Sequence, residues 1–177
     1  MMLGLVVGNG SRKNEVRLRT IGLGTGGPVS GSIDPKAAML AGSMDQKTAI
    51  VTGLPIFAKL EPRSLQAVAT LARVVAAPAD TVLLREGEMA ESFYVIVSGT
   101  VHVERLGRFV RSMSDGGFLG EVALIEGSER TATATCTTQC ELLEFGSFEF
   151  GRVMATFPDV RARVEAAVAR RPHTESP

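Results

Sequence analysis

One acidic and one basic residue lie nine positions apart in a segment of small and apolar residues, GFLGEVALIEGSERTATA, residues 117–134. The planar guanidinium of Arg130 can hold two phosphate oxygens in a bidentate contact better than an ammonium can. Glu121 would repel that phosphate and favours a hydroxyl donor, because an ionised carboxylate only accepts hydrogen bonds. The pair therefore suits a cyclic phosphodiester on a ribose whose 2′-OH is free.

The backbone around Glu121 also suits a bound anion. Gly120 lets another molecule approach the main chain closely. Residues 121–125 are expected to form one helical turn, whose first N–H groups can bind an anion. After Arg130, hydroxyl residues alternate with small apolar ones, which predicts a strand with hydroxyls on one face: Thr131, Thr133 and Thr135.

Short strands are predicted on both sides of this segment. Apolar or alternating runs end at glycines or polar turn signals. The expected strands are 81–84, 93–97, 100–104, 108–113, 131–136 and 141–145. Six or more such strands make an antiparallel roll or sandwich.

Helical periodicity flanks the strands. It begins at Asp45, and Pro62 suits the first turn of a second helix with apolar residues at helical spacing, namely Leu65, Val68, Ala69 and Ala72. After the strands, residues 148–156 predict one helix and Asp159 can cap a last one. The last helix has an apolar stripe of Val160, Val164, Ala167 and Val168, while Arg161, Arg163, Glu165 and Arg170 are expected to face away.

Composition excludes several function classes. Lys plus Arg and Asp plus Glu both total 19, so no net charge points to nucleic acid or an anionic membrane. The opening MMLGLVV is too short to span a bilayer and has no basic region before it, so neither a signal peptide nor a membrane helix is expected. Cys136 and Cys140 are most simply reduced core residues of a cytoplasmic protein.

Catalysis is not expected. A metal enzyme on a similar β-roll needs several His and carboxylate ligands together, and the chain has only His102 and His173. No nucleophile lies beside a plausible base, so we expect no catalytic residues, no metal site and no cofactor.

Residues 1–43 differ from the rest of the chain. They are glycine-rich with weak apolar periodicity, which predicts a flexible arm or an upstream extension before Met44. The glycine motifs VVGNGSRKN and IGLGTGGP are not followed by a helical pattern, so no nucleotide role is expected there. The folded domain is expected over 44–171, followed by a polar tail, 172–177.

The segment GFLGEVAL followed by RTATA resembles the phosphate-binding cassette of cyclic nucleotide-binding domains. Such domains occur in protein kinase A and G regulatory modules, cyclic nucleotide-gated channels and bacterial catabolite activator proteins. The resemblance extends over about residues 45–171. It implies an α+β, mainly β fold, in which a jelly-roll-like antiparallel β-roll lies between N-terminal helices and C-terminal hinge and lid helices.

The resemblance also implies a role for each residue of the cassette. Glu121 would bind the ribose 2′-OH and Arg130 the cyclic phosphate, and Thr131 would place a hydroxyl near the phosphate or base. Backbone contacts are implied for Gly120, Val122 and Ala123. An Asp is more usual in the family at Gly117, and a longer loop is more usual than the turn at 106–108. These departures are expected to alter affinity more than identity.

We expect from this resemblance a stand-alone receptor module without enzymatic activity. The expected ligand is cAMP, with cGMP left open because Thr131 could bond guanine. The C-terminal helices would signal to a separate effector protein, or through self-association by the apolar stripe. No DNA-binding helix-turn-helix follows the lid, so nucleic-acid binding is not expected. Membrane insertion is not expected either, because the apolar opening of the chain is too short to span a bilayer. The alternative is a degenerate domain that keeps the fold and acts as a non-binding interaction or oligomerisation domain.

Overall fold

The computed structural model describes residues 35–170, with side chains described from Met44 onward. The described range contains eight strands, namely β1 Arg73–Ala77, β2 Val82–Leu84, β3 Ser92–Ser98, β4 Val101–Arg105, β5 Arg108–Met113, β6 Phe118–Leu119, β7 Thr133–Cys136 and β8 Cys140–Gly146. All six strands expected from the sequence are present, with small shifts at their ends. The additional strands are β1 and β6.

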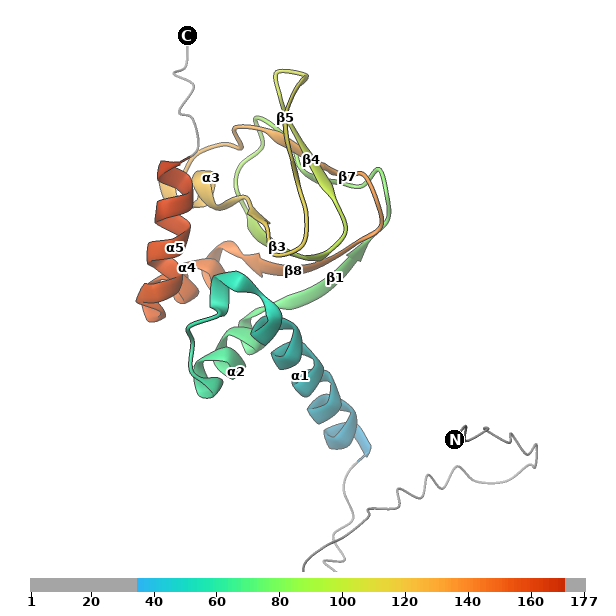
Figure 1. Cartoon of the computed structure of the whole chain (residues 1–177), viewed down its shortest axis with the longest axis vertical. Coiled ribbons are helices and arrows are strands. Elements are labelled where there is room, and N and C mark those ends of the chain that lie inside the picture. The colour runs from blue at the N-terminus through green and yellow to red at the C-terminus, as the bar shows by residue number, and fades with distance from the viewer. Residues whose placement is uncertain (1–34, 171–177) are drawn as a thin grey trace, which may run out of the picture. The chain divides into compact units, whose positions relative to one another are not determined.

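The strands form two four-stranded sheets, with orders β1-β8-β3-β6 and β2-β7-β4-β5. All the pairings between strands are antiparallel. β4 and β5 form a hairpin that extends beyond the rest of the roll (Figure 1). Its two turn residues, Leu106 and Gly107, have φ of 50° and 68°, as a tight two-residue hairpin turn requires. The antiparallel β-roll predicted from the sequence is confirmed.

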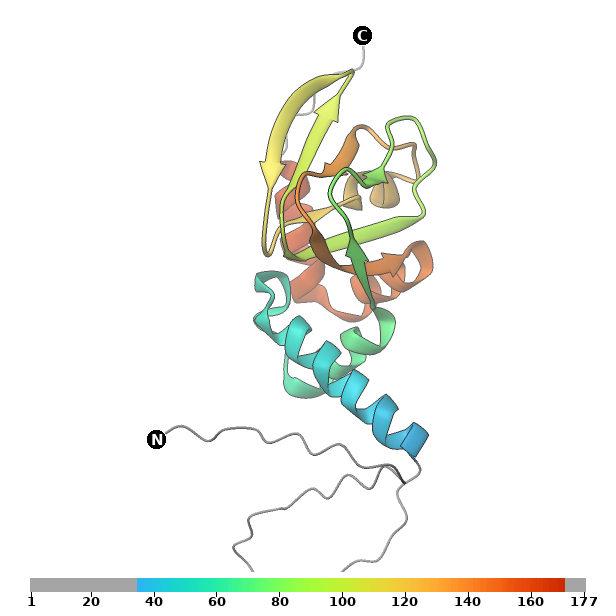
Figure 2. The same cartoon turned by 90° about the vertical axis from the view of Figure 1, so that its right-hand side faces the viewer.

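Helices lie before and after the strands, with one short helix between β6 and β7 (Figures 1 and 2). They are α1 Pro35–Gly53, the 3₁₀ turn η1 Pro55–Phe57, α2 Pro62–Leu71, α3 Glu121–Glu126, α4 Ser147–Thr156 and α5 Pro158–Ala169. The helix expected from Asp45 begins earlier, at Pro35. The polar tail predicted at 172–177 and most of the arm predicted at 1–43 lie outside the described residues.

The start of α5 differs from the sequence prediction. Phe157 is the N-cap and Pro158 is the first helical residue, so Asp159 lies inside the first turn and the capping role predicted for it is wrong. Pro fits this first position because its missing N–H has no partner within the helix there. The charge of Asp159 still favours the positive end of the helix dipole.

Two apolar clusters share the strands of the first sheet. Residues of one cluster lie between the sheets, and those of the other lie between the first sheet and the helices. Along β3, Phe93 and Val95 belong to the helix-side cluster, whereas Ile96 belongs to the cluster inside the roll. The Phe93 ring lies 4.9 Å from the ring of Phe150 and 5.8 Å from that of Phe145, centroid to centroid. These contacts fix α4 against the roll.

The last helix is attached to the N-terminal part of the domain. Val160 and Val164 of α5 are buried in the helix-side cluster. The Arg163 guanidinium does not face away, as the sequence predicted, because its Nη1 donates to the carbonyl oxygens of Pro55 and Ile56, each at 2.8 Å. Two carbonyl groups of η1 thereby acquire a charged donor, which ties α5 to η1.

Candidate functional site

A left-handed glycine starts the short helix at the centre of the site. Gly120, with φ of 93°, is the N-cap of α3. A Cβ added there would lie 2.8 Å from the carbonyl oxygen of Ser92 and 2.9 Å from Nη1 of Arg130. Neither the conformation nor the space suits a side chain. Glycine is needed here because Ser92 and Arg130 of the chain itself approach it closely. The approach of another molecule at Gly120 stays a prediction.

Arg130 lies in the loop before β7 and is only 6% exposed. Its Nη1 donates to the carbonyl oxygen of Gly120 at 2.7 Å, and its Nη2 donates to the carbonyl oxygen of Ser92 at 2.5 Å. Its backbone is held as well, because its N–H donates to the Glu88 carbonyl at 2.8 Å. A guanidinium carries five N–H donors, so these side-chain contacts do not exhaust its capacity to bind an anion.

Burial and neighbouring charge act on Arg130 in opposite directions. Desolvation lowers the pKa of its guanidinium, while Tyr94, Glu121 and Glu91 raise it. Arginine remains protonated in proteins, so the site holds a permanent cation in a poorly hydrated place. Burial raises the pKa of the nearby Tyr94 hydroxyl, because it disfavours the charged phenolate. A desolvated cation of this kind attracts an anionic ligand more strongly than a surface arginine does.

Glu121 is the first residue of α3 and is 0% exposed. It lies close enough to Arg130 for its charge to raise the pKa of that guanidinium. The nearby cation partly offsets the cost of burying a charged carboxylate. The structure thus brings together the two residues that the sequence singled out, in the interior of the domain.

Five of the six predicted site residues line one small cavity of about 50 Å³. They are Gly120, Val122, Ala123, Arg130 and Thr131. The sixth, Glu121, is fully buried and does not line it. The remaining lining residues come from both sheets and the loop before β7, namely Leu84, Val103, Arg111, Leu119, Ala132 and Ala134.

The predicted alternation of hydroxyl and small apolar residues on the two faces of a strand is present in β7. Ala134 and Cys136 are buried inside the roll, while Thr133 and Thr135 are half-buried on the other face of β7. The Thr133 hydroxyl accepts a hydrogen bond from the Glu86 N–H at 3.1 Å. Of the threonines in this run, Thr131 is therefore the one that lines the cavity, and the later hydroxyls serve the roll.

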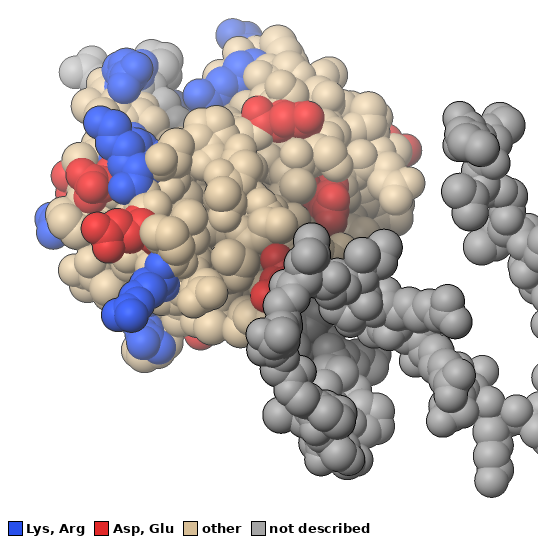
Figure 3. Space-filling model, turned by 60° about the horizontal axis from the view of Figure 1, so that its bottom comes forward, with Lys and Arg blue, Asp and Glu red and all other residues tan. Residues whose placement is uncertain are grey.

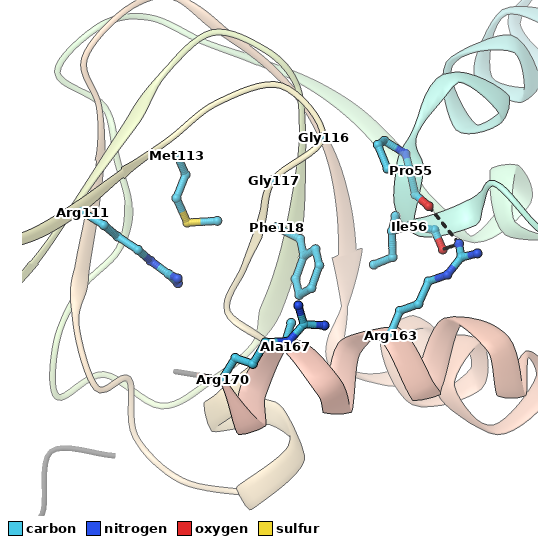
Figure 4. Close-up of a pocket in the computed structure, with 10 residues that line it drawn as sticks. All are labelled: Pro55, Ile56, Arg111, Met113, Gly116, Gly117, Phe118, Arg163, Ala167 and Arg170. Carbon is cyan, nitrogen blue, oxygen red and sulfur yellow. Dashed lines mark hydrogen bonds between the residues drawn. The ribbon is translucent and has the colours of Figure 1, made fainter. Parts of the chain in front are cut away.

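A larger cavity of about 440 Å³ lies between β5, the segment before β6, and α5 (Figure 4). Its walls combine apolar side chains with three guanidinium groups, and the residues are Pro55, Ile56, Arg111, Met113, Gly116, Gly117, Phe118, Arg163, Ala167 and Arg170. Cavities of roughly 300–1,000 Å³ are typical of small-molecule sites. Arg111 lines both this cavity and the smaller one.

Other site types find no support in the described part of the chain. Within residues 35–170 there is no group of three or more His, Cys, Asp or Glu arranged to hold a metal ion. No described helix has the length and apolar character to cross a membrane. One face carries Lys and Arg along one side with Asp and Glu among them (Figure 3), so this face has charges of both signs.

The family model for the cyclic nucleotide-binding domain matches residues 74–157, a range that includes the whole site around Arg130. Residues 74–157 belong to the cyclic nucleotide-binding domain family. The recognition made from the cassette residues is confirmed.

The chain is similar to parts of two longer curated proteins, a channel and a transcriptional regulator. The mouse (Mus musculus) potassium/sodium hyperpolarization-activated cyclic nucleotide-gated channel 2 is 28% identical over 122 residues, which are 69% of this chain and 14% of the channel. The Escherichia coli cAMP-activated global transcriptional regulator CRP is 35% identical over 100 residues, which are 53% of this chain and 48% of the regulator. The chain thus spans less than half of either relative.

Solved structures share the fold of this domain. The regulatory domain of Toxoplasma gondii PKA, crystallised with cAMP, superposes with a TM-score of 0.68 at 18% identity, covering 76% of this chain and 53% of that one. A mutant of a cAMP-binding acyltransferase from Mycobacterium smegmatis superposes with a TM-score of 0.60 at 25% identity, covering 70% of this chain and 40% of the acyltransferase chain. This domain therefore also occurs within an enzyme.

Three residues of the site were not predicted from the sequence. Ser92 accepts a hydrogen bond from Arg130, Arg111 lines both cavities, and Arg163 ties α5 to η1. Each contributes through residues far away in the sequence, so local spacing carries no signal for them. The close approach at Gly120 was the one available indication that another chain segment lies there.

Proposed function

We propose that this domain binds a 3′,5′-cyclic nucleotide and acts as a receptor module without catalytic activity. The observation that carries the proposal is Arg130, a buried guanidinium oriented by the carbonyl groups of Gly120 and Ser92 beside a small cavity. cAMP is the ligand expected from the sequence, and the names of several relatives, which include cAMP, support it. No separate cofactor is part of the proposal.

In the proposed complex Arg130 binds the cyclic phosphate. The backbone of Gly120, Val122 and Ala123 approaches the ligand, and Thr131 adds a hydroxyl, since these residues share one cavity. Glu121 accepts a hydrogen bond from the ribose 2′-OH. Because its side chain is 0% exposed, this contact requires α3 or its neighbours to move. Ligand entry is thus coupled to a movement of α3 or of the segments packed against it.

Occupancy is reported through the C-terminal helices. A ligand shifts a conformational equilibrium only if it contacts one arrangement better than the other. α5 borders the larger cavity and is tied to η1 by Arg163, so a ligand that extends into that cavity touches the helix directly. α4 acts as the hinge between the roll and α5.

The proposed recipient of the signal is a separate effector protein in the cytoplasm. The sequence also offered self-association through the apolar stripe of α5. In the structure Val160 and Val164 are buried within the domain, so most of this stripe already has a partner. Size-exclusion chromatography with and without ligand tests the remaining possibility, because a ligand-dependent dimer would favour self-association over a separate effector.

Calorimetry with cAMP and with cGMP tests the binding proposal. We expect a dissociation constant of about 1 μM or tighter, or roughly 8 kcal/mol of binding free energy. No heat and no thermal shift with either nucleotide would refute the receptor function and support a non-binding interaction domain. Incubation with cAMP should yield no AMP, which separates a receptor from a hydrolase.

Two matched variants test the phosphate contact. Arg130→Met should lose about 2–5 kcal/mol of binding free energy, because a desolvated phosphate is left without its cation. Arg108→Met, on the exposed part of β5, removes an equal charge outside the cavities and should bind like the parent. Thermal unfolding checks that both variants fold, and Arg130→Lys, which keeps the charge, replaces Arg130→Met if that variant does not fold. Parental affinity in the folded Arg130 variant would refute the assignment of Arg130 to the phosphate.

A further inference from the structure

The turn of the β4–β5 hairpin contains a leucine in a left-handed conformation. Leu106 has φ of 50°, and 79% of this residue is exposed. Two-residue turns of this kind favour Asn, Asp or Gly, because other side chains crowd the backbone when φ is positive. Within the domain, neither the conformation nor the exposure favours a leucine at this position.

Two arginines lie directly behind this turn. Arg105 of β4 pairs with Arg108 of β5. Like charges that face each other across two strands destabilise the pair. Arg105 interacts with another group of the chain, so the charge that a partner can reach is chiefly that of the exposed Arg108. Local rules that a domain breaks without a gain of its own are expected at functional sites.

The hairpin also exposes two large apolar side chains just beyond the arginines. They are Phe109, which is 59% exposed, and Val110, which is 50% exposed. Apolar groups that are exposed together mark an interaction site more often than scattered ones do. The hairpin extends beyond the rest of the roll (Figure 1), so its end can enter another phase but offers no broad surface for a flat protein interface.

Two carboxylates lie near the end of the hairpin, but neither is at the turn. Glu86 accepts a hydrogen bond from the N–H of Leu106 at 2.9 Å, which holds the turn in place. Glu104 pairs with Phe109, one pair further from the turn than the two arginines. The order from the end of the hairpin inward is therefore apolar, then basic, then mixed.

We propose that the hairpin tip, residues 105–110, binds the surface of an anionic phospholipid bilayer. Leu106 enters the boundary of the acyl chains, and the guanidinium of Arg108 binds headgroup phosphate, which its planar fork can hold with two hydrogen bonds. Phe109 lies two residues beyond the turn, about 7 Å along the strand. Interfacial helices bury their apolar face by about 5–10 Å, so the tip reaches a comparable depth.

The proposal differs from the expectation drawn from the sequence. That expectation rested on the absence of net charge and of an apolar opening long enough to span a bilayer. The tip spans nothing, and its attraction to a membrane depends on the residues at the end of one hairpin rather than on the total charge. The proposal is also independent of nucleotide binding, because Leu106 and Arg108 line neither cavity of the site.

Flotation of the full chain with lipid vesicles tests the proposal. One set of vesicles contains phosphatidylcholine alone, and the other contains an equimolar mixture of phosphatidylcholine and phosphatidylglycerol. We expect association with the mixed vesicles and weaker association with phosphatidylcholine, and the difference should shrink at high salt because salt screens the anionic surface. No association of the parent with either set overturns the proposal and favours a protein partner. Equal association with both sets overturns the choice of an anionic bilayer.

Leu106→Asn separates membrane binding from folding. Asparagine is favoured at this turn position, so the variant should unfold at the same temperature as the parent or higher. It should bind the mixed vesicles about tenfold or more weakly, because the leucine side chain no longer leaves water. Phe148→Asn replaces an apolar residue on α4 that is 71% exposed, and it should bind vesicles like the parent. Parental vesicle affinity in Leu106→Asn overturns the proposal.

Arg108→Gln tests the basic contact. One charge fewer at the anionic surface should weaken binding to the mixed vesicles about fivefold. Arg161→Gln removes an exposed arginine on α5 and should leave this binding unchanged. Equal affinities of the two variants for the mixed vesicles overturn the assignment of Arg108 to the headgroups.

A single tryptophan can report where the hairpin tip lies, since the chain has none of its own. With mixed vesicles the fluorescence of Leu106→Trp should shift to shorter wavelength, whereas that of Phe148→Trp should stay as in buffer. A shift in neither variant, or in both, overturns insertion by the tip. Calorimetry with cAMP is a separate measurement, so a parent that binds vesicles but no nucleotide would contradict the proposed function alone.

Discussion

Replacing Gly120 by alanine tests whether the close contact at the start of α3 shapes the site. Gly120 and Gly127 are the N-cap and C-cap of α3, and both have positive φ, 93° and 64°. A Cβ at position 120 would lie under 3 Å from Ser92 and Arg130 atoms, whereas one at position 127 would meet nothing within 4 Å. The two substitutions therefore share the backbone cost and differ in the contact.

The magnitudes can be worked out from these differences. A left-handed conformation costs an alanine about 1–2 kcal/mol, partly offset by about 0.4–1 kcal/mol from the less flexible unfolded chain. Gly127→Ala should thus destabilise by about 0–1.6 kcal/mol. Gly120→Ala adds an overpacking cost of about 1–3 kcal/mol, because the Ser92 carbonyl belongs to the backbone of β3 and cannot rotate away. The expected total for Gly120→Ala is about 1–5 kcal/mol, and about 1–3 kcal/mol of it exceeds the cost of Gly127→Ala.

Urea unfolding of the parent and both variants measures these costs, and calorimetry with the preferred nucleotide measures the effect on the site. Gly120→Ala should also bind nucleotide about tenfold or more weakly, because its methyl group displaces Nη1 of Arg130, while Gly127→Ala should bind like the parent. Equal destabilisation by the two substitutions would refute the packing argument. Parental affinity in a folded Gly120→Ala variant would refute the link between Gly120 and the orientation of Arg130.

Three further outcomes test other parts of the structure. Arg163→Met removes the hydrogen bonds to Pro55 and Ile56 and should speed hydrogen exchange in α5 by about tenfold. Arg161→Met removes only an exposed ion pair and should change the exchange rate little. Equal exchange in both variants would contradict the role of Arg163 in holding α5 against η1. The Cys136 thiol, whose pKa is raised to about 12 chiefly by burial, should resist a thiol reagent near pH 8 until the protein unfolds. The pKa of this thiol in the folded protein exceeds its ordinary value of 9.0, so its contribution to stability is complete below about pH 9 and is lost as the pH rises toward 12. Between these pH values Cys136→Ala should reduce the loss of unfolding free energy by up to about 1.4 kcal/mol per pH unit. Urea unfolding at several pH values measures this.

The parts of the fold that the sequence predicts are those with a local signal. Turn glycines and alternating residues located six strands, and the spacing of Glu121 and Arg130 located the two buried charges. β1 escaped prediction because RVVAA follows α2 without a glycine, proline or polar turn, so its apolar residues read as more of the helix. β6 has two residues and exists because β3 pairs with it, which no local pattern encodes.

The parts of the site that the sequence could not predict depend on distant partners. Ser92 lies 38 residues before Arg130, and Arg163 lies 107 residues after the carbonyl of Ile56. Arg111 reads as an ordinary polar residue of an edge strand, and only the packing of β5 beside α5 makes it part of two cavities. Side chains that recognise a ligand across two elements become visible once those elements have been placed.

The helix-side cluster also constrains how this domain is made in the cell. It includes Val51 near the start of the described range and Val164 near its end, and β1 is paired with β8. A chain emerging from the ribosome cannot complete this cluster until α5 has left the exit tunnel, and until then the apolar surface that Val160 and Val164 cover stays exposed. Non-local pairings of this kind fold slowly and leave apolar surface open to aggregation. The nascent domain therefore depends on its last helix to become a folded unit, so that folding is completed only after synthesis of the whole domain.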